Sequence, residues 1–221
     1  MNEIIYKRKS VRRFKKHIFS QDEIERIRSI ISSAQPLCPE SPGTVEMQSN
    51  KAAYCLVFCG KDLVNIGFIG QQISLGLAQI GIGSCWKMGK PAGEIKSGDP
   101  FAISMLFGIP DEPLFRSRSE FKRKKLLEIS EGTDERLEAA RLAPSGLNEQ
   151  DWYFIADCGN IHCYRKKPNI LLSPIKNKLG RIDMGIALCH IAQESTNFDF
   201  QNLIAHPNKK GYMYMGTVVD R

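Results

Sequence analysis

Two stretches of this chain resemble each other when one is moved along the other by 110 residues. Glu25-Arg26-Ile27, followed by RSIISSAQPLCPE, aligns with Glu135-Arg136-Leu137, followed by EAARLAPSGLNEQ. Each copy has the apolar spacing of an amphipathic helix and then runs into a loop that contains proline. This repeat constrains the fold, because a chain that carries the same elements twice predicts two similar units packed together.

Further elements recur after each loop. An apolar strand over residues 53–58 matches one over 152–156, and an apolar, glycine-containing helix over 67–78 matches one over 182–192. Both helices are apolar nearly all round, which is typical of a helix covered on several sides. We therefore predict two lobes, 1–130 and 131–221, each a mixed helix-and-sheet unit. The first lobe has an additional apolar strand at 101–107, and the second ends in a closing strand over 211–219.

The chain of 221 residues is long enough for two closely packed lobes, and its composition of 42% hydrophobic and 25% charged residues is ordinary for a globular protein. No apolar run reaches the roughly 20 residues that cross a bilayer, and no secretory signal is visible at the N-terminus. We therefore expect a cytoplasmic protein that does not bind membranes. Seven cysteines without paired CxxC spacing, and histidines without an HExxH pattern, lead us to expect no metal site.

The net charge of +7 is concentrated in two segments, Lys7 to His17 and Lys122 to Lys125. Three interpretations are open: a solvated basic face, a nucleic-acid surface, or a site for a smaller anion such as a cofactor phosphate. No aromatic residues alternate with the arginines in a stacking pattern, which disfavours nucleic acid.

Arg8, Ser10 and Arg12 alternate along a segment that looks extended from Val11 onward, so their side chains are expected to point to one side. Two guanidinium groups and a hydroxyl on one face suit a phosphate, because the guanidinium fork matches phosphate oxygens. A plain surface strand is the alternative.

Four motifs carry a resemblance to a known family. The segment RKSVRRF (8–14) is similar to the RRSxRxF opening of nitroreductase-family flavoproteins, and APSGLNEQDW (143–152) resembles their APSxxNxQPW loop. GIGSCW (81–86) resembles the GLGSCW turn, with IDMG (182–185) similar to the helix before that turn, and FKRKKLLEI (121–129) is similar to a basic segment that approaches the cofactor phosphate. In the loop, Asp151 stands where the family has proline.

The resemblance implies an α+β fold, with helices packed on mainly antiparallel sheet, and FMN as the cofactor. Arg8, Ser10 and Arg12 would bind its phosphate and ribityl end, with Lys122 or Arg123 adding charge. Met88 and Gly89 would offer backbone groups near flavin N5. The flavin ring would be flanked from the other lobe by Pro144, Ser145, Gly146 and Asn148.

The order of the motifs differs from the ordinary family, in which the APSxxNxQPW loop precedes the GLGSCW turn and comes from the partner subunit of a homodimer. Here the loop lies in the second lobe, and the repeat places Cys38 opposite Asn148 and Gln35 opposite Ser145. The chain therefore resembles such a dimer fused into one polypeptide, a pseudo-dimer with one working site in a monomer.

The function implied is an NAD(P)H-dependent FMN oxidoreductase that reduces nitroaromatic, quinone or related acceptors by a ping-pong mechanism. The flavin performs the chemistry, so no catalytic side chain is expected. The alternatives are a flavin-binding protein without a nitroreductase role and, from a different class, a basic nucleic-acid-binding protein.

Overall fold

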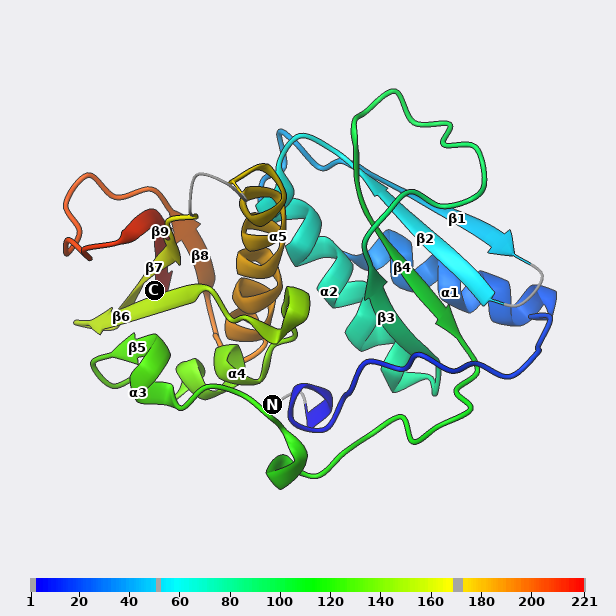
Figure 1. The fold of residues 1–221 in the computed structure, drawn as a ribbon, viewed down its shortest axis with the longest axis horizontal. Coiled ribbons are helices and arrows are strands. Elements are labelled where there is room, and N and C mark those ends of the chain that lie inside the picture. The colour runs from blue at the N-terminus through cyan, green and yellow to red at the C-terminus, as the bar shows by residue number, and fades with distance from the viewer. Residues whose placement is uncertain (1–2, 51–52, 169–172, 221) are drawn as a thin grey trace.

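Two sheets lie on either side of a layer formed by two long helices (Figure 1). The structure is a computed structural model that describes residues 3–50, 53–168 and 173–220. The first sheet has the strand order β1-β2-β4-β3 and consists of β1 (Thr44–Asn50), β2 (Ala53–Cys59), β3 (Gly83–Lys87) and β4 (Phe101–Gly108). All of its pairings are antiparallel. The helices α1 (Gln21–Ser33) and α2 (Leu63–Gln79) belong to the same part of the chain.

The second sheet has the order β5-β6-β7-β9-β8. It consists of β5 (Ser130–Glu131), β6 (Trp152–Asp157), β7 (Asn160–Lys166), β8 (Phe198–Gln201) and β9 (Tyr212–Asp220). Only the short β5–β6 pairing is parallel. The long helix of this part is α5 (Ser173–Ala192), preceded by α4 (Arg136–Leu142). The expected α+β fold with helices on mainly antiparallel sheet is confirmed.

Polar side chains fix the helix starts. Ser20 caps α1 and forms a capping box with Glu23. Asp62 caps α2 by accepting hydrogen bonds from the backbone N–H groups of Val64 and Asn65 at 3.0 and 3.3 Å. After α2 the chain turns at Gly81, whose φ of +83° is the left-handed conformation that favours glycine.

The two sheets share a strand order once β5 is set aside. In each, the four remaining strands lie in the order first, second, fourth, third, and the long helix connects the second strand to the third. By this topology β6 corresponds to β1, so the predicted match of residues 53–58 with 152–156 was wrong. The sequence reading missed β1 and β7, because β1 (TVEMQSN) has only two strongly apolar residues and β7 interleaves polar and apolar ones. The predicted closing strand, β9, lies inside its sheet between β7 and β8.

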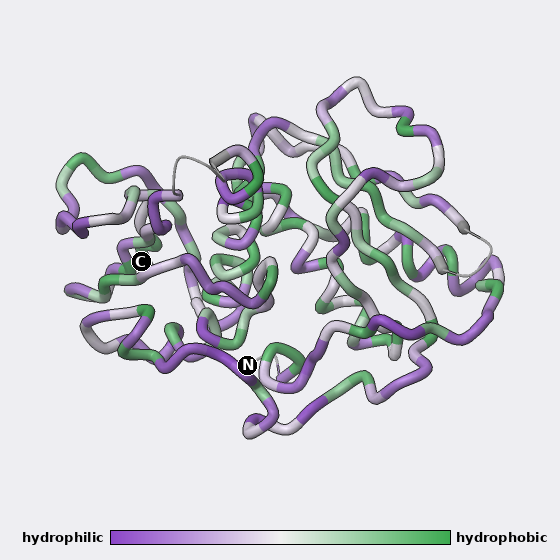
Figure 2. The backbone as a smooth tube through the Cα atoms, in the orientation of Figure 1, coloured by the Kyte–Doolittle hydropathy of each residue, from purple (hydrophilic) through white to green (hydrophobic). Residues whose placement is uncertain are grey.

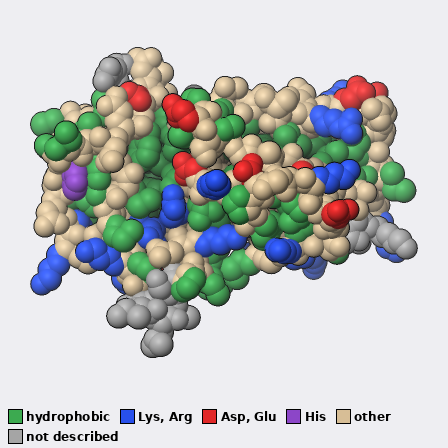
Figure 3. All heavy atoms as spheres, turned by 90° about the horizontal axis from the view of Figure 1, so that it is seen from above, with side chains coloured by type: hydrophobic (Ala, Val, Ile, Leu, Met, Phe, Trp, Pro, Cys, Tyr) green, Lys and Arg blue, Asp and Glu red, His purple; other side chains and the backbone are tan. Residues whose placement is uncertain are grey.

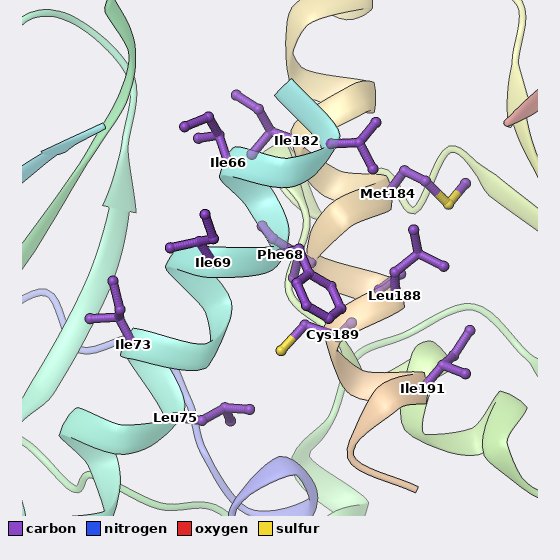
Figure 4. Packing of buried hydrophobic residues seen from close by; sticks show 14 of the residues in the cluster. Ile66, Phe68, Ile69, Ile73, Leu75, Ile182, Met184, Leu188, Cys189 and Ile191 are labelled. Carbon is purple, nitrogen blue, oxygen red and sulfur yellow. The ribbon is translucent and has the colours of Figure 1, made fainter. Parts of the chain in front are cut away.

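The hydrophobic core is centred on α2 and α5, which pack against each other along their lengths (Figure 4). Both helices are longer than the predicted apolar segments at 67–78 and 182–192. Figure 2 shows apolar residues concentrated in the central helices and strands, and hydrophilic residues along the outer connections. Four of the seven cysteines are buried there, and all seven are free. In the part of the chain that the structure describes, no helix is long and apolar enough to cross a bilayer.

Two glycines set the distance between the central helices. A Cβ atom on Gly67 of α2 would overlap the backbone carbonyl oxygen of Ile182, and one on Gly185 of α5 would overlap that of Val64. Each glycine thus meets the residue three positions before the other, so the contact is reciprocal. Only glycine allows two helix backbones to approach this closely.

The N-terminal segment and the connection over residues 109–129 run along one edge of the molecule (Figure 1). The N-terminal segment begins with the 3-10 turn η1 (Glu3–Tyr6) and then follows β3, where the N–H of Val11 donates to the carbonyl of Ser84 at 3.0 Å. Between the sheets the chain passes through η2 (Arg118–Glu120) and α3 (Leu126–Ile129), and η3 (Gly146–Asn148) precedes β6. These connections supply most of the polar side chains of the site described next.

Candidate functional site

A cavity of about 680 Å³ opens between β3 and α5, and we call it the main cavity. Its volume is in the range of small-molecule and cofactor sites. Its walls come from both ends of the chain. They comprise Ser10, Arg12, Cys85, Trp86, Lys87, Met88, Ile103, Arg116, Glu120, Lys122, Arg123, Pro144, Ser145, Gly146, Leu147, Asn148, Leu179, Ile182, Asp183 and Ile186.

Nine of the eleven residues predicted to bind a cofactor lie in this wall, although they come from four distant segments. They are Ser10, Arg12, Met88, Lys122, Arg123, Pro144, Ser145, Gly146 and Asn148. The other two, Arg8 and Gly89, are not part of it. Gly89 follows Met88 with a left-handed φ of +94°, and the Ser104 hydroxyl donates to its carbonyl at 3.3 Å.

Arg8 lies outside the cavity wall, with only 5% of its surface exposed. Its guanidinium makes two long contacts of 3.4 Å, to the Lys9 carbonyl and to the Ser74 hydroxyl, and pairs with no carboxylate among the described residues. Desolvation, followed by the nearby positive charge of Arg116, lowers the pKa of Arg8 to about 10. A buried guanidinium without a counterion is costly, so this position favours a bound anion.

Arg116 was missed in the sequence reading and shares this environment. Its side chain lines the main cavity, and its Nε is buried without a hydrogen-bond partner in the part of the chain that the structure describes. The guanidinium lies over the ring of Phe121, 4.6 Å from the centroid. Burial lowers the pKa of Arg116. In the sequence, Arg116 lies close to the KRKK segment, and this closeness could have marked it as a site residue. It was not predicted because it belongs to none of the four matched motifs.

A carboxylate fixes the backbone at Arg12. Glu112 accepts hydrogen bonds from the backbone N–H groups of Arg12 and Arg13 at 2.6 and 3.1 Å and pairs with Lys9 at 3.3 Å. These contacts, the Arg12 bond foremost, lower the pKa of Glu112 to about 2. On the same segment Val11 is fully buried against Gly83, whereas Ser10 and Arg12 line the cavity. The predicted alternation therefore places Ser10 and Arg12 in the wall, while Arg8 lies deeper.

Arg123 ties the basic segment to the loop at 144–148. It donates to the carbonyls of Ala143 and Leu142 at 3.1 and 3.4 Å and to the Asn148 side-chain oxygen. The Asn148 amide in turn donates to the Lys122 carbonyl at 2.8 Å. Both polar atoms of Asn148 are thus occupied by residues 122 and 123. Its observed contacts hold the loop, which differs from the ring-flanking role that the resemblance implied.

The loop itself has an unusual backbone. Leu147, Asn148 and Gln150 all have positive φ values, of 52°, 59° and 46°. Gln150 stabilises this conformation, because its N–H donates to the Ser145 hydroxyl at 3.0 Å and its side-chain oxygen accepts from the N–H of Lys124 at 2.8 Å. Left-handed residues with side chains cost about 1–2 kcal/mol each, so these bonds maintain a strained and specific shape.

Asp183 of α5 anchors the same loop from the other side and was not predicted as a site residue. Both of its carboxylate oxygens lie 3.0 Å from the N–H of Gly146. Desolvation raises the pKa of Asp183 to about 7, against the effect of this hydrogen bond. Asp183 lies two residues before Gly185, and the residue two positions before Gly67 on α2 is Asn65. The Asn65 side-chain oxygen accepts hydrogen bonds from the N–H groups of Leu37 and Cys38 at 2.7 and 3.3 Å. Each central helix thus holds the loop that follows the preceding helix.

A buried polar chain connects the cavity wall to both parts of the molecule. Trp86 donates to the Gln71 oxygen at 3.3 Å, and the Gln71 amide lies 2.9 Å from Nε2 of His190. Desolvation lowers the pKa of His190 to about 3, so its ring is neutral, and Nδ1 donates to the Ala139 carbonyl at 2.9 Å. This chain fixes the orientation of Trp86 in the wall.

The corresponding region on the opposite side of the helix pair has a different composition. Phe68 of α2 stacks on Phe198 of β8 with ring centroids 5.6 Å apart. Counted from the reciprocal glycines, Phe68 corresponds to Ile186, which lines the main cavity. Cys38 and Gln35 lie on the loop held by Asn65, and Gln35 bonds to Gln72. Among the described residues, no group of three or more His, Cys, Asp or Glu side chains could hold a metal ion.

Comparisons with known proteins agree with this architecture. Residues 1–195 match the family described as "Putative TM nitroreductase". The fold is similar to that of a "putative nitroreductase" from Thermotoga maritima, with a TM-score of 0.72 and 22% identity over 99% of this chain and 93% of that one. No curated protein matches the chain.

Other solved structures are less similar. An FMN-dependent nitroreductase from Clostridium difficile R20291 has a TM-score of 0.44 and 15% identity, over 55% of this chain and 95% of that one. A "putative NADH dehydrogenase/NAD(P)H nitroreductase" from Parabacteroides distasonis has a TM-score of 0.47 and 14% identity, over 60% of this chain and 97% of that one. Because the family match extends over most of its length, the chain belongs to the family described as putative TM nitroreductases.

Proposed function

We propose that this chain is an FMN-dependent oxidoreductase that uses NAD(P)H to reduce nitroaromatic, quinone or related acceptors. The observation that carries the proposal is the pair of arginines, Arg8 and Arg116, of which Arg116 lines the main cavity and Arg8 is buried outside its wall. Among the described residues Arg8 has no carboxylate partner, and the buried Nε of Arg116 has no hydrogen-bond partner. A phosphate monoester would supply the missing charge and acceptors, since it carries close to two negative charges and several acceptor oxygens.

The residues present fit FMN at both of its ends. Ser10, Arg12, Arg116, Lys122 and Arg123 all line the main cavity and would surround the phosphate. Apolar side chains, among them Trp86, Ile103 and Ile182, form the rest of the wall and suit a planar ring. Met88 and Gly89 would contribute backbone groups near flavin N5, and Pro144, Ser145, Gly146 and Asn148 would close the cavity from the second lobe.

When bound, FMN would supply the hydride chemistry, in two half-reactions that alternate in ping-pong fashion. The chain's own residues would hold the cofactor and exclude water, and none would act as an indispensable acid or nucleophile. The rigid loop supports this role, because Arg123 and Asp183 secure it from opposite sides. A basic nucleic-acid surface fits less well, since Arg8, which forms no ion pair among the described residues, is buried. On the face drawn in Figure 3, basic side chains are interspersed with acidic and apolar ones.

We further propose that the chain is a pseudo-dimer of lobes 1–130 and 131–221 that binds one FMN as a monomer. The shared strand order, the reciprocal glycines and the equivalent roles of Asn65 and Asp183 support this proposal. The mirror position would bind no flavin, because Phe68 and Phe198 pack together there and Cys38 and Gln35 replace the polar loop residues.

A visible spectrum with flavin quantitation on the purified protein, combined with its mass in solution, tests the proposal. We expect flavin absorbance, one FMN per chain in a monomer, and bleaching by NADH or NADPH without oxygen. Flavin that no nicotinamide donor bleaches would favour a flavoprotein with another role. Two flavins per chain, or a site formed only between two chains, would refute the pseudo-dimer, and affinity for nucleic acid without any for flavin would refute the enzyme.

A further inference from the structure

A second, smaller cavity of about 170 Å³ adjoins the main one, and we call it the side cavity. The two share Met88, Gly146, Leu147, Leu179 and Asp183 in their walls. The side cavity adds Glu149, Asp151, Ile175, Lys176 and Gly180. A molecule lying in it would therefore reach the main cavity past the loop at 144–148.

The mouth of the side cavity is apolar and unusually exposed. Leu147 is 76% exposed, Ile175 64% and Met88 55%, which places three of the molecule's exposed large hydrophobic residues around one opening. Exposed apolar residues that gather in one place mark binding sites more often than single ones do. This cluster favours an apolar ligand.

Leu147 is held at this opening in a backbone conformation that leucine disfavours. Its φ of 52° and ψ of 14° are left-handed, a conformation that bulky residues avoid. Gly146 on one side is fixed to Asp183, and Asn148 on the other is fixed to Arg123 and Lys122. The fold therefore bears a conformational cost to expose a leucine, which is the pattern of a functional constraint.

The charges of the side cavity are opposite to those of the main cavity. Glu149, Asp151 and Asp183 line it, and Lys176 is its one cation among the described lining residues. Lys176 pairs with Glu149 at 3.1 Å, and neither Asp151 nor Asp183 forms an ion pair among the described residues. Outside the wall, the charges of Lys124 and Arg165 also act on Asp151, and Lys124 donates to the Gln150 carbonyl. Asp151, where the family loop has proline, supplies one of these carboxyl groups.

We propose that the side cavity is the subsite for the electron acceptor, and that it selects apolar aromatic molecules that are neutral or cationic over anionic ones. This proposal rests on the proposed function, because the subsite opens onto the cavity assigned to FMN. The apolar mouth provides the affinity for an aromatic ring, and the Asp151 carboxyl group, which lines the side cavity and not the main one, repels sulfonates and carboxylates. The basic residues of the main cavity would hold the cofactor phosphate, whereas the acidic residues of the side cavity would favour neutral and cationic acceptors over anionic ones.

A binding experiment tests the subsite independently of turnover. Benzyltrimethylammonium and benzenesulfonate carry similar rings and opposite charges, and each is titrated by calorimetry into the FMN-loaded protein. We expect the cation to bind about three- to fivefold more tightly, the size of a partly exposed electrostatic interaction. Asp151→Asn should reduce that ratio. Leu147→Ser should weaken both probes, and Leu127→Ser, at a leucine 89% exposed elsewhere, should change neither.

Turnover provides the second readout, with naphthoquinones that carry no charge, a trimethylammonium group or a sulfonate. We expect the lowest kcat/KM for the sulfonate, and a smaller difference in Asp151→Asn. Failure of both probes to bind, preference for benzenesulfonate, or an unchanged ratio in Asp151→Asn would overturn the subsite even if the quinones are reduced. The absence of NAD(P)H turnover with the calorimetric preference intact would instead refute the proposed oxidoreductase and leave the cavity's charge selection standing.

Discussion

Gly67 and Gly185 lie where α2 and α5 cross, and each leaves room for a backbone carbonyl of the opposite helix, that of Ile182 and that of Val64. The two contacts are related as if by a two-fold axis. This crossing sets the separation of the sheets, and with it the width of the main cavity.

Substitution of either glycine should therefore be severe. Gly67→Ala or Gly185→Ala should lower the free energy of unfolding by about 3 kcal/mol or more, because the helices must separate to admit a methyl group. Denaturant unfolding followed by circular dichroism measures this. Gly98→Ala is the matched control, since a Cβ there meets nothing within 4 Å. Similar small effects at all three positions would contradict the close crossing.

The buried charge of Arg8 should have opposite effects on binding and on stability. Arg8→Met should weaken FMN binding by about 1.5–3 kcal/mol, the contribution of a charge-assisted hydrogen bond. The flavin-free protein should be as stable as before or more so, because an uncompensated buried charge has been removed. Arg12→Ala should weaken binding similarly, and substitutions of the exposed Lys15 or Lys16 should have little effect. Equal losses at all four positions, measured by flavin fluorescence, would indicate a diffuse basic patch.

The contacts of Asn148 predict a difference between the two loops. Asn148→Ala removes the bonds to Arg123 and Lys122 and should loosen the 144–148 loop, weakening FMN binding by about 1–3 kcal/mol. Cys38→Ala, at the matched position of the first repeat, should leave flavin content unchanged. Equal losses of flavin in both variants would mean that the two loops contribute alike.

Asp183 should make stability depend on pH. Its pKa is raised to about 7 in the folded protein, from 3.8. The folded state therefore holds a proton that the unfolded state has released, and stability falls as pH rises from about 4 to 7. Asp183→Asn keeps an acceptor for Gly146, as Asn65 does for its own loop, and removes the ionisation. The variant should match the wild type at pH 4 and exceed it by on the order of 4 kcal/mol at pH 8.

Thermal unfolding of the flavin-free protein at several pH values measures this difference. Asn65→Asp is the converse control, and should introduce a destabilisation that grows with pH. A constant difference between Asp183→Asn and the wild type from pH 4 to pH 8 would show that Asp183 does not titrate in this range.

The sequence predicted the residues that belong to recognisable motifs. It was less informative about residues whose role depends on how distant parts of the chain pack together. The motifs identified Ser10, Arg12, Lys122, Arg123 and the 144–148 loop, all of which meet in one cavity. Arg116 and Asp183 were missed because their importance arises from burial and from neighbours far along the chain. The strand β1 was missed because it lies on an edge and pairs only with β2, so its composition carries little of the apolar signal of an inner strand.

The walls of the main cavity lie on a single polypeptide, although one wall comes from β3 and the other from α5 and the loop before β6. In a site built between separate subunits, dilution favours dissociation of the subunits, and the two walls of the site then separate. Here the covalent connection through residues 109–129 replaces that association with an intramolecular one, at an effective concentration that dilution does not change. Occupancy of this cavity should therefore follow the ligand concentration alone, however scarce the protein is.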